Sequence, residues 1–314
     1  MAPDIFRFKS LNNKEKYMLA PIVEIFCDID DFCKKYINGQ LSKALPSAQN
    51  IRYRQSMMSI SEIITILILF HVSHYRTFKD YYRECILLNS HNYFPNAVSY
   101  NRFVEIEKNV LPYLTAYLLS KMGNKTNYYY IDSSKLAVCH NKRIFNHTVF
   151  KGIANRGKTS MGWFFGLKLH IVINHKGEIV NFCITKGNID DRNVLLRLFS
   201  RLRGLAAGDK GYISGDKANI LEAQGLKFIT KIKSNMKKRM LTVFEKFFLA
   251  QRCIVETVIG QLKALCHIEH TRHRNPDNFV MNLISGLAAY CISPKKPSIN
   301  LSKFQHKFNA VIPS

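Results

Sequence analysis

The chain has 314 residues and carries 46 Lys and Arg against 22 Asp and Glu, which gives a formal net charge of +24. Hydrophobic residues make up 47% of the sequence, which excludes a disordered chain and suffices for the core of one large domain or two modest ones. So large a positive surplus opposes folding by self-repulsion, and a polyanion offsets that repulsion. We therefore expect a nucleic acid as the partner, and a solvated basic surface is the alternative.

Neither the apolar runs nor the cysteines indicate a membrane or secreted protein. The longest apolar run, residues 63–70, is far shorter than the roughly 20 apolar residues that a membrane-spanning helix needs. Residues 1–16 lack the apolar centre of a signal peptide. The eight cysteines include no CxxC pair, which argues against a zinc module and favours reduced, mostly buried thiols. We expect a cytoplasmic protein that does not enter a membrane.

Residues 1–125 are predicted to form an all-α N-terminal domain. Ser59 followed three residues later by Glu62 is the capping-box pattern of a helix start, and an apolar run comes directly after it. A second helix is expected to begin near Ser99 and to kink or break at Pro112. Short polar turns between compact helices are typical of helix-turn-helix DNA readers, and a helical packing domain without DNA contact fits the pattern equally well.

Residues 126–293 change to a pattern of strands and helices. Gly177 lies between two apolar runs that predict a hairpin, and the later runs alternate with helical segments. Antiparallel pairing followed by alternation predicts a mixed α/β sheet with helices on its faces. We expect residues 294–314 to form a loosely held basic tail. The expected strands are residues 128–132, 163–174, 178–185, 205–209 and 226–233, with a helix over 244–265 near the end.

A basic segment follows the first predicted strand of this domain. Residues 133–177 contain eight Lys and Arg and no acidic residue. Such a segment favours a track for phosphate groups, although a flexible basic loop with no defined role would have the same composition. The candidates for DNA contact are Lys135, Arg143, Lys151, Arg156 and Lys158 within it, and Lys210 and Tyr212 further along.

Three carboxylates are the candidates for the chemistry. Asp132 and Asp209 each close an apolar run, so both are expected at strand ends, and Glu256 is expected on a helix. Carboxylates held in this way can bind two divalent ions about 3.5–4 Å apart, which activate an attacking oxygen and neutralise a departing one in phosphodiester chemistry. Arg252 and Lys263 lie four residues before and seven after Glu256, so the three share a helical stripe. A plain surface ion pair between Arg252 and Glu256 is the alternative.

Several other residues have both a functional and an ordinary interpretation. Asp190 and Asp191 are alternative carboxylates, but a helix start is expected there, where aspartate most often caps. Asp216 is likewise expected in the first turn of a helix. Trp163, the only tryptophan, could stack on a base, and packing within the hairpin is the alternative.

The motifs that contain these residues resemble those of the DDE transposases of bacterial insertion sequences. The motifs are YYIDSSK at Asp132, GNIDDRN at residues 187–193, AAGDKGYIS at Asp209, and Arg252-x3-Glu256-x6-Lys263. The spacing is similar as well, because 209 − 132 gives 77 positions between the aspartates and 256 − 209 gives 47 to the glutamate. Within the family, the pattern is similar to the insertion-sequence group numbered 982, and the resemblance extends over about residues 53–292.

The resemblance implies an RNase H-like catalytic domain over residues 126–293. Its mixed five-stranded sheet would hold Asp132, Asp209 and Glu256 as the ligands of two Mg²⁺ ions, which Mn²⁺ can replace. The implied reaction is Mg²⁺-dependent phosphodiester cleavage at the ends of a mobile element, followed by attack of the freed 3′-hydroxyl on target DNA.

The resemblance also implies partners and DNA contacts. The partners would be the terminal inverted repeats and the target DNA, bound by a homodimer or higher assembly at the nucleoid of a bacterial cytoplasm. Residues 1–125 would bind the DNA ends, the partner subunit, or both. Arg252 and Lys263 match DNA-contacting positions of the family, whereas Leu249 replaces the tyrosine of related transposases, so no tyrosine contact carries over.

Two other functions fit the same residues. A structure-selective nuclease with the same fold, such as a junction resolvase, would cleave DNA without joining it. A decayed transposase homologue would bind DNA without catalysis, although all three carboxylates and both flanking basic residues are present.

Overall fold

The chain divides into two compact units. A helical unit contains Met1–Lys121, Ala264–Ile268 and Pro276–Lys295, and a sheet unit contains Met122–Lys263, Glu269–Asn275 and Lys296–Ser314. The computed structural model describes residues 22–41, 57–73, 75–160, 162–231, 240–269 and 273–301. The first 21 residues of the predicted helical domain and most of the predicted tail therefore lie outside the described residues. Within the described ranges, no helix has both the length and the apolar character that crossing a bilayer requires.

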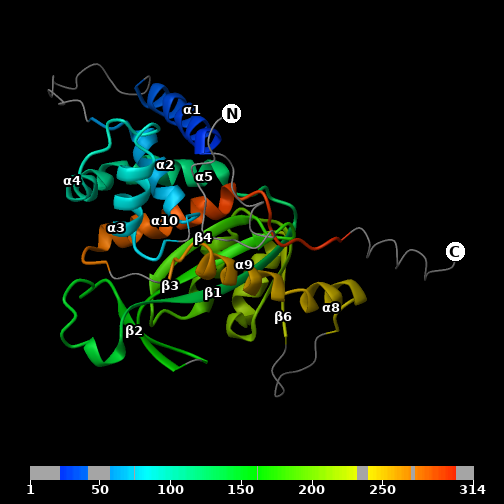
Figure 1. Cartoon of the computed structure of the whole chain (residues 1–314). Helices are drawn as coiled ribbons and strands as arrows, with labels where there is room; N and C mark the ends of the chain where they lie inside the picture. Colours follow the sequence, from blue (N-terminus) through cyan, green and yellow to red (C-terminus); the bar gives the residue numbers. More distant parts are fainter. Residues whose placement is uncertain are drawn as a thin grey trace. The chain divides into compact units, whose positions relative to one another are not determined.

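The described part of the helical unit consists of helices (Figure 1). They are α1 (Ile22–Leu41), α2 (Ile60–Phe70), α3 (Phe78–Asp80), η1 (Tyr81–Asn89), α4 (Tyr100–Ile106), η2 (Glu107–Val110), α5 (Leu111–Lys121) and α10 (Pro276–Ile292). The predicted capping box of α2 is confirmed, since the Ser59 hydroxyl accepts from the Glu62 backbone and the Glu62 carboxylate accepts from the Ser59 backbone at 2.6 Å. Pro112 lies in the first turn of α5, where proline is tolerated, and η2 forms the break predicted near it.

The C-terminal helix α10 belongs to the helical unit, which differs from the predicted domain boundary at residue 293. The imidazole of His71, just after α2, lies 2.9 Å from the Ser285 hydroxyl of α10 and 2.6 Å from the Cys266 carbonyl oxygen. All three residues are buried. Hydrogen bonds between segments about 200 residues apart leave no local pattern, so the packing of α10 with the N-terminal helices could not be predicted from the sequence.

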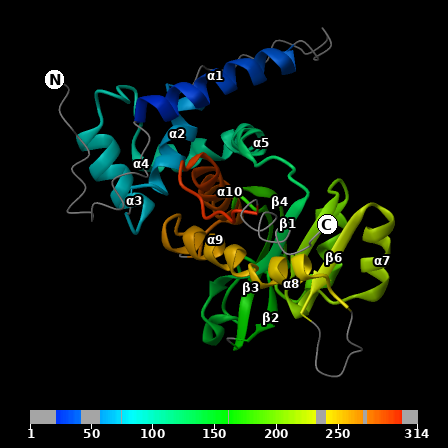
Figure 2. The same ribbon diagram turned by 90° about the vertical axis from the view of Figure 1, so that its right-hand side faces the viewer.

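The sheet unit is built on one mixed six-stranded sheet (Figure 2). Its strands are β1 (Tyr128–Cys139), β2 (Asn155–Thr159), β3 (Gly162–Asn174), β4 (Ile179–Lys186), β5 (Gly204–Gly208) and β6 (Leu226–Thr230). Their order is β2-β3-β1-β5-β6, with β4 also paired to β3. β3 is antiparallel to β1, β2 and β4, whereas β5 is parallel to β1 and β6. The mixed α/β class and the turn at Gly177, where φ is 71°, are as predicted, and β2 is an additional strand within the basic segment.

Asp132 lies inside β1 and not at its end, which corrects one prediction. On one side, β1 stays paired with β3 as far as Cys139. On the other side, its pairing with β5 ends at Tyr130 opposite Ala207. The apolar run thus stops where β1 loses its parallel neighbour, and Asp132 lies just beyond that point.

Helices cover both faces of the sheet. They are η4 (Asp191–Val194), α6 (Leu195–Phe199), η5 (Lys210–Tyr212), α7 (Gly215–Ala223), α8 (Val243–Ala250) and α9 (Cys253–Ala264), with the short η3 (Asn141–Arg143) after β1. One face, here the α6 face, carries Tyr129 and Ile131, which share a core with Phe199 of α6. The opposite face, here the α9 face, carries Tyr130, whose ring stacks on Phe248 of α8 with centroids 4.4 Å apart. α9 follows α8 and lies beside β1 and β3 in both views (Figures 1 and 2).

The helix predicted over residues 244–265 is two helices, which corrects a second prediction. The Gln251 backbone N–H bonds to the Phe247 carbonyl and closes α8, and the Val255 N–H bonds to the Arg252 carbonyl and opens α9. Arg252 therefore precedes the helix that carries Glu256.

Candidate active site

The strand register brings Asp132 and Asp209 level with each other. β1 and β5 are parallel with Tyr128 opposite Leu205, so partners in this pair differ by 205 − 128 = 77 positions. The two aspartates differ by 209 − 132 = 77 positions as well. Continuing the register past the last pair therefore brings the two aspartates to the same level, and the charge of Asp209 raises the pKa of Asp132, so the two carboxylates lie near each other. The 77-position spacing of the two aspartates in the sequence therefore equals the offset between paired residues of β1 and β5.

α9 adds a third carboxylate and a cation to this pair. The guanidinium of Arg252 lies 2.8 Å from the Glu256 carboxylate and 3.8 Å from that of Asp209. The Arg252 side chain is 15% exposed, whereas those of Asp209 and Glu256 are 51% and 53% exposed. Glu256 also lies in the first turn of α9, where the helix dipole favours a carboxylate. Arg252 thus stands between two carboxylates that remain open to solvent.

Asp132 is the most enclosed of the three carboxylates. Burial raises the pKa of Asp132 from 3.8 to about 6. The Ser133 N–H, which donates to the carboxylate at 2.8 Å, lowers the pKa, as does the positive charge of Arg252. The negative charges of Glu256 and Asp209 raise it further. The three carboxylates therefore act on one another, and the site holds more negative charge than the chain neutralises.

The donor set suits hard divalent cations, but the side chains do not form a ready-made metal cage. Carboxylate oxygens are the ligands that Mg²⁺ prefers, and the guanidinium of Arg252 already lies between two of them. Across the described residues, no group of three or more His, Cys, Asp and Glu side chains is gathered closely enough to hold a metal ion. The buried Nε of Arg252 also finds no hydrogen-bond acceptor within the described ranges. The site fits divalent cations in its charge and ligand chemistry.

Lys263 does not join this cluster. Its ammonium group forms an ion pair with Glu269 at 3.2 Å. Leu249, at the position of the tyrosine in related transposases, is 7% exposed and packs within α8. Of the predicted stripe, only Arg252 and Glu256 meet at the carboxylate site.

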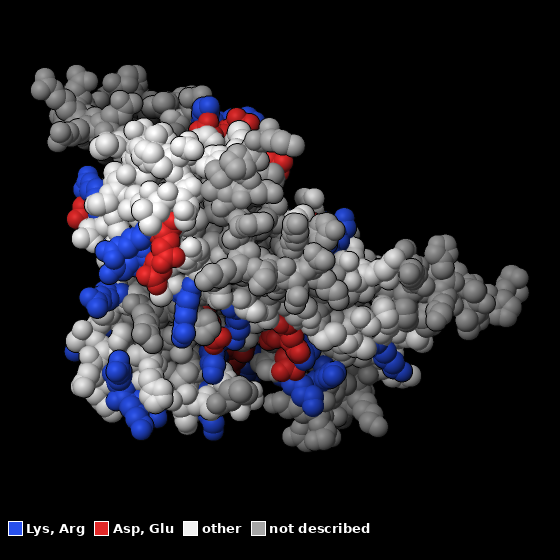
Figure 3. Space-filling view, viewed as in Figure 1, with Lys and Arg blue, Asp and Glu red and all other residues white. Residues whose placement is uncertain are grey.

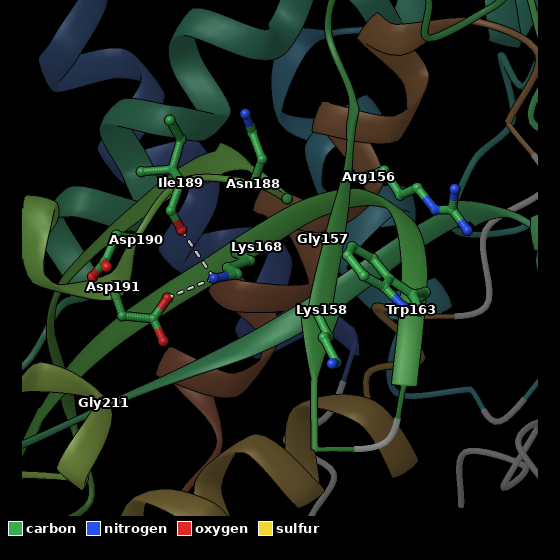
Figure 4. Close-up of a pocket in the computed structure, with 11 residues that line it drawn as sticks. Arg156, Gly157, Lys158, Trp163, Lys168, Asn188, Ile189, Asp190, Asp191 and Gly211 are labelled. Atoms are coloured by element: carbon green, nitrogen blue, oxygen red, sulfur yellow. Dashed lines mark hydrogen bonds and ion pairs between the residues drawn. The ribbon is translucent and has the colours of Figure 1, made fainter.

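Arg156, Lys158 and Trp163 form a basic aromatic surface on β2 and β3. The Arg156 guanidinium and the Lys158 ammonium lie 5.1 and 5.5 Å from the centre of the indole, which is 52% exposed. Lys158 is the cross-strand partner of Trp163, and Arg156 is two residues away, so all three project from one face. By alternation along β3, this is the face of Ile171, the strand partner of Asp132. The three residues also border an open pocket of about 450 Å³, and its other lining residues include Lys168, Asp190 and Asp191 of the α6 side (Figure 4).

The other predicted DNA contacts are dispersed. Lys135 lies three residues after Asp132 on β1, an odd number, and therefore projects from the α6 face. Tyr212 is 1% exposed and belongs to the core on the α6 face, so its prediction as a DNA contact is wrong. The exposed candidates are Arg143, Lys151 and Lys210.

The two neighbouring aspartates of the GNIDDRN motif have different roles. Asp190 caps η4 as predicted, accepting from the Arg192 backbone at 2.9 Å and pairing with its guanidinium. Asp191 does not cap. Its carboxylate accepts hydrogen bonds from Lys168 at 2.8 Å (Figure 4) and from the Ser133 hydroxyl at 3.1 Å. Sequence reasoning missed Lys168 and Ser133, because a contact across two antiparallel strands has no local signal.

Comparison with known proteins gives a family match. Residues 122–276 match the family described as the transposase DDE domain. No curated protein gives a significant match. Among solved structures, a cryo-EM structure of the piggyBac transposase synaptic complex with hairpin DNA is similar at 12% identity and a TM-score of 0.45, over 88% of this chain and 71% of that chain. The matched residues 122–276 contain Asp132, Asp209 and Glu256 together with Arg252 and Lys263.

A mixed sheet with interacting carboxylates and a basic surface on the same face is an arrangement typical of DNA-processing enzymes. The family match makes this class specific. Residues 122–276 match a transposase DDE domain, and a domain of that kind is an enzyme that cleaves DNA and transfers strands in transposition. The match covers most of the sheet unit and none of α1 to α5.

Proposed function

We propose that the protein is an insertion-sequence transposase of the group numbered 982, which cleaves phosphodiester bonds at the ends of its element and joins the freed 3′-hydroxyl to target DNA. The observation that carries the proposal is the equality of two spacings. The β1–β5 register and the separation of Asp132 and Asp209 are both 77 positions. Two carboxylates held side by side in this way, with Glu256 on the same face, form the acidic site that the DDE domain requires.

The sheet unit is, in this proposal, an RNase H-like catalytic domain. Apart from the short β2, the strands follow the order β4-β3-β1-β5-β6. β3 is antiparallel to both β4 and β1, and β5 and β6 run parallel to β1. This five-stranded mixed sheet with helices on both faces is the architecture that the family resemblance implies.

Asp132, Asp209 and Glu256 are the residues that would hold two Mg²⁺ ions, or Mn²⁺ in their place. When bound, such ions activate the attacking oxygen and neutralise the departing one. β1 fixes Asp132 through a buried position and a backbone donor, and α9 presents Glu256 from its first turn. Arg252 keeps Glu256 and Asp209 together in the metal-free protein, and its charge suits contact with a DNA phosphate.

The DNA is proposed to follow the α9 face. Arg156 and Lys158 project from that face together with Trp163, which combines phosphate-binding charges with a ring on which a base can stack. In the part of Figure 3 occupied by the sheet unit, basic side chains surround a small acidic group. Arg143, Lys151, Lys210 and Lys263 are further contact candidates at exposed or half-buried positions.

The helical unit would bind the element ends, the partner subunit, or both. Three of its helices, α2, α3 and α4, begin with side-chain caps at Ser59, Thr77 and Ser99, which suits a separately folded recognition module. Because two element ends must be processed together, we propose a dimer or higher assembly on DNA, acting at the bacterial nucleoid.

A joining assay tests the proposal. The full-length protein is incubated with labelled DNA that carries the terminal repeats, a target plasmid and Mg²⁺, beside the Asp209→Asn variant. We expect the wild type to transfer label covalently into the plasmid, and the variant to bind the ends without cleaving them. Cleaved ends without joined product would identify a structure-selective nuclease. Binding without cleavage in either Mg²⁺ or Mn²⁺ would identify a decayed homologue.

A further inference from the structure

Asp191 is an inward-facing carboxylate that the proposed reaction does not use. Its neighbour Asp190 pairs with Arg192 at the surface, where their side chains are 41% and 49% exposed. The side chains of Asp191 and its partner Lys168 are only 23% and 12% exposed. The two aspartates are adjacent and chemically identical, so the difference between them lies in what Asp191 contacts.

Asp191 joins β1 and β3 on the face opposite to Asp132. One carboxylate oxygen accepts from Lys168 of β3 at 2.8 Å, and the other accepts from the Ser133 hydroxyl of β1 at 3.1 Å. The Lys168 ammonium also donates to the Ile189 carbonyl at 2.9 Å, which fixes the loop that carries Asp191 (Figure 4). Ser133 follows Asp132 directly, so this hydrogen bond restrains β1 next to the catalytic carboxylate.

Asp191 also lies against the turn that carries Asp209. The oxygen that accepts from Ser133 is 3.9 Å from the position that a Cβ on Gly211 would occupy. Burial raises the pKa of the Tyr212 hydroxyl, and the negative charges of Asp191 and Asp132 raise it further. Gly211 and Tyr212 are two and three residues after Asp209. The Asp191 carboxylate is therefore hydrogen-bonded to the strand of Asp132 and lies near the turn that follows Asp209.

We propose that Asp191 is a positioning residue, which sets the separation of Asp132 and Asp209 from the opposite face of the sheet. The inference rests on the proposed function. The β1–β5 pairing ends at Tyr130 and Ala207, so sheet hydrogen bonds no longer hold the two strands at the level of the aspartates. Catalytic groups must be held to within about 0.5 Å of their working geometry. Asp191 supplies a connection at the point where the strand pairing stops.

Asp191→Asn and Asp190→Asn form a matched pair for the test, measured on the full-length protein. Calorimetric titration with Mg²⁺ alone gives the metal affinity, thermal unfolding in EDTA gives stability, and terminal-repeat DNA gives cleavage rates and DNA affinity. We expect Asp191→Asn to raise the Kd for Mg²⁺ and to lower cleavage by about tenfold or more each, the range seen when residues that orient metal ligands are lost. DNA affinity in EDTA should not change. Asp190→Asn should match the wild type in metal affinity and cleavage.

A double variant separates alignment from stability. Asp191→Asn leaves the Lys168 ammonium buried without its partner, and this alone lowers the unfolding temperature. Lys168→Met combined with Asp191→Asn removes the unpaired charge, so the unfolding temperature should recover while the Mg²⁺ affinity stays low. Ser133→Ala keeps the ion pair and should weaken Mg²⁺ binding by a smaller factor. Recovery of metal affinity together with the unfolding temperature in the double variant would overturn the positioning role.

The same titrations distinguish failure of this inference from failure of the proposed function. A wild type that binds no Mg²⁺ and cleaves no DNA would refute the proposed function, and the positioning role with it. A wild type whose Mg²⁺ binding is weakened by Asp132→Asn but not by Asp191→Asn would leave the proposed function intact and refute the positioning role alone.

Discussion

The two faces of the sheet carry charge in opposite ways at the level of Asp132 and Asp209. On the α9 face, three carboxylates share the guanidinium of Arg252, and two of the three are about half exposed. On the α6 face, the single carboxylate of Asp191 meets the single ammonium of Lys168, and both are mostly buried. The first face holds negative charge that the chain leaves uncompensated, whereas on the second face the charge of Asp191 is compensated by Lys168, and Lys135, opposite Lys168 on β1, adds a further positive charge.

A face with uncompensated charge is suited to binding a ligand, whereas a compensated buried pair is suited to a structural role. Like charges that repel one another lower stability, so a group of carboxylates with one cation points to a ligand that supplies the missing positive charge. A buried ion pair whose hydrogen bonds are satisfied requires no bound ligand, and it holds the elements that carry it in place. Substitutions on the α9 face should therefore change chemistry, and substitutions on the α6 face should change alignment and stability.

The largest effect is expected from neutralising any one carboxylate of the α9 face. Asp132→Asn, Asp209→Asn and Glu256→Gln should each lower the single-turnover rate of terminal-repeat cleavage by about 10³-fold or more, since each loses several kcal/mol of charge stabilisation. Asp216→Asn removes an exposed carboxylate from the first turn of α7 and should leave the rate unchanged. A large loss of cleavage rate in only one of the three variants would show that the three carboxylates do not act together as one metal site.

Asp132 should also lower the stability of the metal-free protein at neutral pH. Its pKa is about 6 in the folded chain, above the usual 3.8, so between these values the folded state binds the proton more tightly than the unfolded state does. Stability therefore falls as the pH rises from about 4 to about 6, and it stays lower above that range. Asp132→Asn removes this loss and should raise the free energy of unfolding near neutral pH by about 1–3 kcal/mol.

Urea unfolding in EDTA measures this gain. It should be present at about pH 7.5 and small at about pH 4, where the wild-type carboxyl is protonated in the folded state and only about half ionised in the unfolded state. Asp191→Asn provides the contrast, because removing one partner of a balanced pair should destabilise the protein at neutral pH. If Asp132→Asn is no more stable than the wild type at neutral pH, the negative charge of the α9 face is compensated after all.

Local signals in the sequence predicted the features that depend on a few consecutive residues. The capping box at Ser59 and Glu62 and the hairpin turn at Gly177 are found as expected. The order of strands and helices also gave the mixed α/β class. Backbone preferences and short-range hydrogen bonds determine these features without help from the rest of the chain.

The site depends on long-range contacts that the sequence does not display. The 77-position spacing of Asp132 and Asp209 is visible in the sequence, but only the β1–β5 register explains it. Asp191 pairs with Lys168 across 23 positions, and helical periodicity gave no sign of the break before α9 at Arg252. Each of these three features depends on packing between elements that are distant in the sequence. A pattern of neighbouring residues carries no information about such packing.

A smaller effect is expected for the cation of the α9 face. Arg252→Gln removes the group between Asp209 and Glu256, and it should lower the free energy of unfolding of the metal-free protein by about 1 kcal/mol, since solvent screens the half-exposed carboxylates. Lys263→Gln is the matched control, because it breaks a single ion pair with Glu269. Mg²⁺ should stabilise both variants, because both keep the three carboxylates, and it should stabilise Arg252→Gln more, since no guanidinium then competes for the site. Equal stabilisation of both variants would show that Arg252 does not occupy the cation site.

The smallest expected effect is a change in the salt dependence of DNA affinity, and it should differ between basic residues on the two faces. Arg156→Gln and Lys158→Gln each remove one positive charge from the face that carries Asp132. Each should reduce the slope of log affinity against log salt by about 0.9, the value of one phosphate contact. Lys135→Gln removes a charge from the α6 face and should leave the slope unchanged.

Fluorescence anisotropy with terminal-repeat DNA in EDTA, over a range of salt concentrations, measures these slopes. Because all three substitutions remove one positive charge from the same region of sequence, net charge alone would give them equal slopes. A lower slope for Arg156→Gln and Lys158→Gln but not for Lys135→Gln therefore requires that the phosphates lie along one face. Equal slopes for all three variants would mean that the basic segment attracts DNA by its overall charge, and that the α9 face binds no defined phosphate track.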